Sequence, residues 1–308
     1  MKYKLVFFLL ALLCLPTASN SQSILQSHGK IIRIKELTSA VLLLENEWNS
    51  FGTGFLVKRN INSNQRTFLI TNKHVLNQKK ELRDKAQKIR LYLNTAVNGK
   101  LKGIEREMDI ISNGTRLWRE HPDESVDVLA IDVTNFLKGI PNLSVSYLSS
   151  NLDGIIADSE VLDREEITIG DEIIAIGYPR FTDLITYKQG EAYLPIIRQG
   201  IIGSQVNLNY IEKIFDNGKV EIKNLRGFLI DGAIIPGSSG SPIFLKPYSP
   251  RIIHGRNNMS GTHPYLLGIV SENRYALTKT SPMLISFANI GFVFNSSTIL
   301  ETLDLFLK

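Results

Sequence analysis

The hydrophobic residues of this chain occur in short runs, or alternate with polar residues, and the runs are separated by Gly, Asn, Asp and Pro. A period of two and an enrichment in β-branched and aromatic residues are typical of strands. The pattern therefore predicts an all-β chain with twelve strands. These strands cover Ala40–Glu45, Gly54–Lys58, Thr67–Thr71, Ile89–Leu93, Val126–Val133, Glu172–Ile176, Gly200–Gly203, Val220–Lys223, Gly227–Ile230, Pro242–Leu245, Tyr265–Val270 and Ile290–Phe294.

The end of the chain has a different pattern. Thr298 stands three residues before Glu301, which is the spacing of a capping box, and apolar residues recur on one helical face. We therefore expect a terminal helix over Ser297–Leu307.

A polar, irregular stretch over 139–166 separates the predicted strands into two groups. We expect it to connect an N-terminal β half, residues 20–150, to a C-terminal β half, residues 151–308. A length of 308 residues is sufficient for two such halves.

The N-terminus has the pattern of a signal peptide. Lys2 and Lys4 precede the apolar run Leu5–Leu15, and small residues suited to cleavage follow it. This run is too short to span a bilayer as a helix, and no second long apolar run follows. We expect residues 1–19 to be removed and the protein to be exported, periplasmic or secreted, with no membrane span.

The composition of the chain excludes several classes of partner and of catalytic site. A net charge of +5, from 35 basic and 30 acidic side chains, is too mild to indicate a nucleic-acid partner. The only cysteine, Cys14, lies in the signal peptide, which excludes a thiol nucleophile, a disulfide framework and a Cys-based zinc site from the mature chain. No HExxH motif or comparable cluster occurs. We expect no metal and no cofactor.

Two candidate catalytic residues lie in the first half. His74 follows an apolar strand, where a side chain can face a cleft, although a lone His is more often structural. Asp127 starts an otherwise apolar strand, and a buried carboxylate there needs a partner such as an imidazole N–H. The simpler interpretation of Asp127 is a turn residue.

The third candidate, Ser239, lies in the turn Pro236-Gly237-Ser238-Ser239-Gly240 before an apolar strand. Glycines near a serine allow dihedral angles that turn the hydroxyl outward and direct backbone N–H groups into one hollow. Such a hollow suits the oxyanion of acyl transfer. A plain Gly/Ser turn is the alternative, but the order His, Asp, Ser along the chain favours a catalytic role for Ser239.

Eight segments, in this order along the chain, resemble those of the trypsin-like, chymotrypsin-fold serine peptidases, and more closely the bacterial Deg/HtrA type. They are GTGFLV at Gly52–Val57, TNKHV at Thr71–Val75, VDVLAIDV at Val126–Val133, IGDEIIAIGYP at Ile169–Pro179, RQGIIGS at Arg198–Ser204, FLIDGAIIPGSSGSPIF at Phe228–Phe244, LLGIVS at Leu266–Ser271 and NIGFVFNSSTIL at Asn289–Leu300. The resemblance implies two packed six-stranded antiparallel β-barrels, with the active site in the cleft between them.

The resemblance also implies roles for the candidate residues. Ser239 would be the nucleophile, His74 the general base and then acid, and Asp127 the group that orients His74. The N–H groups of Gly237 and Ser239 would form the oxyanion hole. Ser241 stands where the family usually has Gly, which places a side chain close to the nucleophile.

Specificity follows from motif positions. Ala233 would lie at the base of the substrate pocket, with Ser271 and Glu272 at its wall. Because Ala233 cannot pair with Lys or Arg, we expect a small or medium apolar residue before the cleaved bond. The chain ends shortly after the terminal helix, so we expect no peptide-binding PDZ module.

The sequence therefore predicts an exported serine endopeptidase that acts on protein or peptide substrates through an acyl-enzyme. A non-catalytic peptide-binding protein of the same fold and a serine esterase are alternatives. An α/β-hydrolase is disfavoured because its residues run Ser, acid, His along the chain. Assembly, for example as a trimer, is left open.

Overall fold

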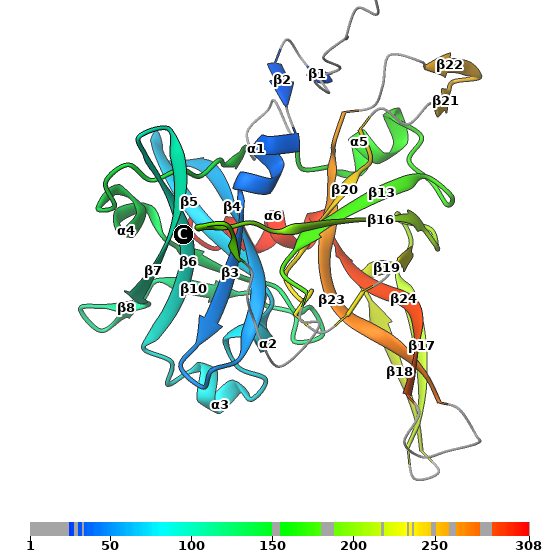
Figure 1. Cartoon of the computed structure of the whole chain (residues 1–308). Coiled ribbons are helices and arrows are strands. Elements are labelled where there is room, and N and C mark those ends of the chain that lie inside the picture. Colours follow the sequence, from blue (N-terminus) through cyan, green and yellow to red (C-terminus); the bar gives the residue numbers. More distant parts are fainter. Residues whose placement is uncertain are drawn as a thin grey trace, which may run out of the picture.

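The computed structural model describes residues 25–27, 30–32, 34–149, 155–179, 188–216, 219–232, 234–235, 237–247, 251–258, 263–277 and 285–307. It confirms the predicted fold class, because the chain is mostly β and forms two packed β halves with a helix near its end (Figure 1). The predicted signal peptide, residues 1–19, lies outside the described residues.

The first half is built on a sheet of eight strands, two more than expected. Seven lie in the order β10-β11-β5-β4-β3-β6-β7, and β12 pairs in parallel with β4. The strands are β3 (Val41–Asn46), β4 (Phe51–Ile61), β5 (Asn64–Thr71), β6 (Lys88–Val97), β7 (Lys100–Asp109), β10 (Trp118–Glu120), β11 (Leu129–Asp132) and β12 (Leu148–Ser149).

The second half is a closed six-stranded barrel in the order β13-β16-β19-β24-β23-β20, as the sequence predicts for that half. All its strand pairs are antiparallel. The strands are β13 (Glu172–Gly177), β16 (Ile196–Ile202), β19 (Gly227–Gly232), β20 (Pro242–Leu245), β23 (Leu266–Leu277) and β24 (Ile285–Asn295).

Short hairpins and helices complete the two halves. The hairpins are β1 (Leu25–Ser27) with β2 (Lys30–Ile32), β8 (Ile111–Ser112) with β9 (Thr115–Arg116), β14 (Lys188–Gln189) with β15 (Ala192–Tyr193), β17 (Tyr210–Asp216) with β18 (Lys219–Leu225), and β21 (Arg251–Ile253) with β22 (Arg256–Asn258). The helices are α1 (Ile34–Ser39), α2 (Lys73–Leu76), α3 (Lys80–Arg83), α4 (Thr134–Lys138), α5 (Ser159–Arg164) and α6 (Ser296–Asp304).

Many strands are unbroken apolar runs because both of their faces are covered. In β3, Val41 and Leu43 enter a cluster shared by the two halves, whereas Leu42 and Leu44 enter a separate cluster inside the first half. In β13, Ile174 likewise faces the shared cluster, and its neighbours face the interior of the barrel. Because successive side chains along a strand point to opposite faces, one strand contributes residues to two hydrophobic cores.

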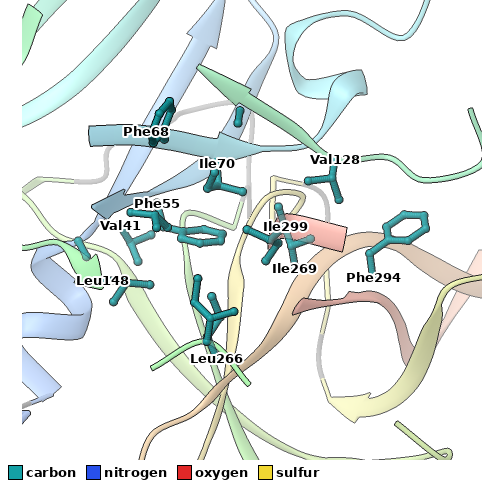
Figure 2. Packing of buried hydrophobic residues seen from close by; sticks show 14 of the residues in the cluster. Val41, Phe55, Phe68, Ile70, Val128, Leu148, Leu266, Ile269, Phe294 and Ile299 are labelled. Carbon is teal, nitrogen blue, oxygen red and sulfur yellow. The ribbon is translucent and has the colours of Figure 1, made fainter. Parts of the chain in front are cut away.

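The shared cluster joins the halves. Figure 2 shows Phe55 and Ile70 of the first half beside Leu266 and Ile269 of the second, with Ile299 of α6 among them. Burial of these side chains removes a large apolar area from water, which holds the two halves in one arrangement. The candidate residues that each half contributes can therefore keep a fixed separation.

Helix α6 follows the barrel but packs partly on the first half, and Figure 1 shows it between the two halves. Arg59 pairs with Asp304, and the rings of Phe68 and Phe306 lie 4.7 Å apart. His121 Nε2 lies 3.1 Å from Glu301, which Arg226 also binds. The helix thus ties the end of the second half to the first.

Each of the twelve predicted strands overlaps an observed strand, and the predicted helix overlaps α6. Segment Val126–Val133 is shorter than expected, since β11 begins only at Leu129. The boundary predicted near residue 150 stays a prediction.

Candidate active site

His74 lies in the short helix α2, directly after β5 ends at Thr71. The helix is held by Asn46, whose side-chain amide donates to the carbonyls of Val75 at 2.9 Å and Leu76 at 3.0 Å. Gly52 of β4 permits the close approach, because a Cβ there would lie 2.6 Å from the Val75 side chain. The His74 side chain remains 31% exposed, so that it can be reached from solvent.

Asp127 lies two residues before β11 and contacts His74 twice. Its Oδ2 lies 2.5 Å from His74 Nδ1, and its Oδ1 accepts from the His74 backbone N–H at 3.2 Å. Asn72 fixes the same loop by donating to the Asp127 carbonyl at 2.7 Å. An ionised carboxylate only accepts hydrogen bonds, so Nδ1 carries a proton and the lone pair of neutral His74 lies on Nε2.

The protonation state of Asp127 follows from its surroundings. Burial by itself would raise the pKa of this carboxyl, but hydrogen bonds from the His74 ring, the His74 backbone and the Ser271 hydroxyl, together with the charge of the ring, hold the pKa below its usual value. Asp127 is therefore ionised at neutral pH and can stabilise a positive charge on the imidazole.

Lys73, next to His74, binds the loop that leads to Asp127. Its side chain is buried and its Nζ donates to the Asp123 carbonyl at 3.0 Å. Burial lowers the pKa of this ammonium group, while nearby carboxylates oppose the shift. The lysine thus holds the loop 123–127 through the Asp123 carbonyl.

Ser239 lies in the turn before β20, and the turn depends on two glycines. Gly237 and Gly240 both have φ of +85°, in the left-handed region that favours glycine. A Cβ at Gly240 would stand 1.8 Å from the Thr53 carbonyl oxygen, so only glycine fits there. The half-buried Ser239 donates its hydroxyl to the Ser271 carbonyl at 3.0 Å.

The N–H groups of this turn fall into two kinds. Ser238 N–H donates to Ile235 O at 3.0 Å, and Gly240 N–H donates to Val270 O at 2.9 Å. For the N–H groups of Gly237 and Ser239 the structure records no acceptor among the residues it describes. These two donors are the ones that the sequence predicts for an oxyanion hole.

Ser238, directly before the predicted nucleophile, is fully buried and contacts Arg198 of β16. Arg198 Nη2 donates to the Ser238 hydroxyl at 2.6 Å. Burial lowers the pKa of this guanidinium to about 10, so Arg198 still carries its charge at neutral pH. A charged donor on a buried hydroxyl fixes the back of the turn.

Ser271 lies in β23 and has a role that sequence reasoning missed. The pairing of β23 with β24 shifts between Val270 and Glu272, so that Ser271 is an extra residue in a β-bulge. A bulge redirects a side chain, and here the Ser271 hydroxyl donates to Asp127 Oδ2 at 2.9 Å. Ser271 therefore contacts both Asp127, through its hydroxyl, and Ser239, through its carbonyl.

The other predicted pocket residues are less informative. Ala233 and the side chain of Glu272 lie outside the described residues, and only the backbone of Glu272 is placed, opposite Phe292. Ser241 is fully buried, and its hydroxyl occupies the space beside Gly177, where a Cβ would lie 2.0 Å from it. The Ser241 side chain thus points toward β13.

The described residues offer neither a cluster of metal-binding side chains nor a membrane-spanning helix. Groups of three or more His, Cys, Asp or Glu side chains arranged to hold a metal ion do not occur in that part of the chain. Nor does any helix there have the length and apolar character that crossing a bilayer requires.

A known protein family and solved structures resemble this chain. Residues 52–247 match the family model of the trypsin-like peptidase domain. Among solved structures, the inactive form of the Rv3671c protease is similar with 16% identity and a TM-score of 0.41, over 88% of this chain and 91% of that one. The active form of the Rv3671c protease from M. tuberculosis is similar with 16% identity and a TM-score of 0.43, over 88% of this chain and 82% of that one. A comparison with curated proteins gives no significant match.

Proposed function

This chain belongs to the family of proteins with a trypsin-like peptidase domain, and on that premise we propose that it is an exported serine endopeptidase. Ser239 is the nucleophile, His74 the general base, and Asp127 the group that orients and stabilises the imidazole. The observation that carries the proposal is the contact of His74 Nδ1 with Asp127 Oδ2, with Ser239 joined to the same carboxylate through Ser271.

The mechanism uses these contacts in order. A serine hydroxyl is a weak nucleophile at neutral pH and needs a base in contact with it. In the proposed reaction, rotation of the Ser239 side chain moves its hydroxyl from Ser271 O to His74 Nε2. As Ser239 Oγ bonds to the scissile carbonyl carbon, its proton passes to Nε2, and Asp127 stabilises the imidazolium.

The negative charge that develops on the carbonyl oxygen needs donors already in place. The N–H groups of Gly237 and Ser239 meet this need, because their neighbours in the turn already have internal acceptors. His74 then gives its proton to the departing amine, leaving an acyl group on Ser239. Water, activated by His74, releases the product acid.

The substrate is a protein or peptide. We propose a small or medium apolar residue before the cleaved bond, from the position of Ala233 in the motif. A peptide-library profile tests this preference, and cleavage mainly after Lys or Arg would contradict it. Export is proposed from the pattern of residues 1–19, and mass determination of the protein recovered outside the cytoplasm tests whether they are removed.

The decisive experiment compares casein hydrolysis by the mature protein and by Ser239→Ala. We expect the variant to lose at least about a thousandfold in kcat/KM, since removal of a catalytic nucleophile leaves only residual acceleration. Ser112→Ala, an exposed serine in β8, is the matched control and should keep full activity.

Labelling with a fluorophosphonate probe separates the alternatives. Wild-type protein should react and Ser239→Ala should not, whereas a non-catalytic peptide-binding protein would leave both unlabelled. Equal casein hydrolysis by wild type and Ser239→Ala would overturn the proposal. Labelling together with hydrolysis of esters, but of no peptide, would favour an esterase.

A further inference from the structure

Thr53 belongs to the first half but contacts the nucleophile turn of the second. It lies in β4 between Gly52 and Gly54 and is completely buried. Its segment, GTGFLV, resembles the family pattern, but that pattern by itself gives the threonine no role. Its contacts, however, lie at the junction of the two halves.

Two of those contacts hold the nucleophile turn. The Thr53 backbone N–H donates to the Ser239 carbonyl at 2.9 Å, and the Thr53 hydroxyl donates to the Gly237 carbonyl at 3.0 Å. The hydroxyl also accepts from the Tyr178 backbone N–H at 3.0 Å. The side-chain oxygen thus donates and accepts at the same time, which fixes the direction of its proton.

A third contact faces the other way. The Thr53 carbonyl accepts from the Thr71 hydroxyl at 2.8 Å, and Thr71 is the last residue of β5, three residues before His74. The same residue is therefore bonded to the turn that carries Ser239 and to the strand end that carries His74. Gly240 allows this proximity, because any side chain there would meet the Thr53 carbonyl.

The two carbonyls that Thr53 binds belong to Gly237 and Ser239, the residues that carry the proposed oxyanion donors. Gly237 and Ser239 are the residues of the turn whose N–H groups have no recorded acceptor among the described residues, and Thr53 holds the carbonyl of each. Anchoring a residue by its carbonyl restricts its backbone angles and hence the direction of its N–H. Preorganised donors are effective because they need no reorientation when charge develops.

Resting on the proposed function, we propose that Thr53 is a positioning residue, which sets Ser239 and the two oxyanion donors against His74 across the junction of the halves. It touches neither substrate nor reacting atoms in this role. Its effect passes through the turn 237–239. The rate of acylation should therefore depend on the Thr53 hydroxyl more strongly than substrate binding does.

The test compares Thr53→Val, Thr53→Ser and Thr302→Val in the full-length mature protein. Valine has nearly the shape of threonine but lacks the hydroxyl, and serine keeps the hydroxyl. Thr302 of α6 is the matched control, because it is also completely buried and its hydroxyl donates to the Thr298 carbonyl at 2.7 Å. The readouts are kcat, KM, the rate of fluorophosphonate labelling and Tm.

We expect Thr53→Val to lower kcat and the labelling rate by about tenfold to a hundredfold, with KM within about twofold, as for loss of aligned donors. Thr53→Ser should recover wild-type kcat within about threefold. Thr302→Val should lower Tm and leave kcat unchanged. Wild-type kcat in Thr53→Val, or an equal loss of kcat in Thr302→Val, would overturn the inference.

Thr71→Val keeps the inference testable if Thr53→Val fails to fold. This variant removes only the bond on the far side of Thr53. We expect kcat to fall about threefold to tenfold without a change in KM, and an unchanged kcat would again overturn the inference. Failure of the proposed function has a different signature, since wild type and Ser239→Ala would then behave alike.

Discussion

His74 and Ser271 bind the same oxygen of Asp127: Nδ1 of the imidazole lies 2.5 Å from Oδ2, and the Ser271 hydroxyl donates to it at 2.9 Å. The two donors come from different halves of the molecule. Each half therefore contributes to the orientation of the carboxylate, and the barrel that carries Ser239 also holds the carboxylate beside His74.

Replacing Ser271 by alanine should lower kcat by about tenfold, because a hydrogen bond to a charged group is worth about 1.5–3 kcal/mol. The backbone carbonyl that receives the Ser239 hydroxyl is retained. Steady-state kinetics on a peptide substrate measures the effect. Full activity in Ser271→Ala would show that the hydroxyl does not orient Asp127.

The same variant should change the pH dependence of stability. In the wild type the pKa of Asp127 is lower in the folded state than in the unfolded chain, so its ionised form stabilises the fold above about pH 4. That contribution is lost as the pH falls through the folded pKa. Losing one donor raises the folded pKa, so Ser271→Ala should be less stable than wild type at neutral pH, and the gap in Tm should close as the solution is acidified. A gap in Tm that does not narrow on acidification would contradict this.

Gly240→Ala should be far more harmful than Gly99→Ala. Both glycines have positive φ, +85° and +73°, so both substitutions incur the cost of a left-handed conformation, about 1–2 kcal/mol. No atom lies within 4 Å of a Cβ at Gly99, whereas a Cβ at Gly240 would stand 1.8 Å from the Thr53 carbonyl oxygen.

Thermal unfolding and fluorophosphonate labelling measure the difference. Gly99→Ala should lower Tm modestly and keep normal labelling. Gly240→Ala should lose labelling by displacing the Ser239 turn, even where the protein still folds. Similar labelling in the two variants would mean that the turn tolerates a shift away from Thr53.

Ser241→Ala should raise Tm. The Ser241 hydroxyl is completely buried and has no hydrogen-bond partner among the described residues, so removing it relieves a desolvation cost of about 1–3 kcal/mol. The small void left beside Gly177 offsets part of this gain. Activity should change little, because the hydroxyl points toward β13; a lower Tm would show that the group is satisfied in solution.

The sequence predicts the local elements well. Each predicted strand depends on a short pattern of neighbouring residues, such as the apolar run of Thr67–Thr71 or of Pro242–Leu245, and both are found in strands. The contact between His74 and Asp127 could be anticipated because a carboxylate at the start of an apolar strand needs a partner.

Two contacts could not be predicted, for separate reasons. The direction of the Ser271 side chain depends on a β-bulge, which shifts the pairing of β23 by one residue without a marker in the sequence. The role proposed for Thr53 depends on a turn 184 positions away, and only packing of the two halves brings the residues together.

The sheet of the first half has more strands than the sequence predicts, because strands such as β7 are largely polar on their exposed face.

Helix α6 has a consequence for the timing of folding. It follows the last barrel strand, β24, along the chain, yet Arg59, Phe68 and His121 of the first half contact it or the residues that follow it. The first half therefore cannot complete its packing around Phe68 and His121 before the strands of the barrel and the helix after them are present. Folding of the first half is thereby coupled, through α6, to folding of the second.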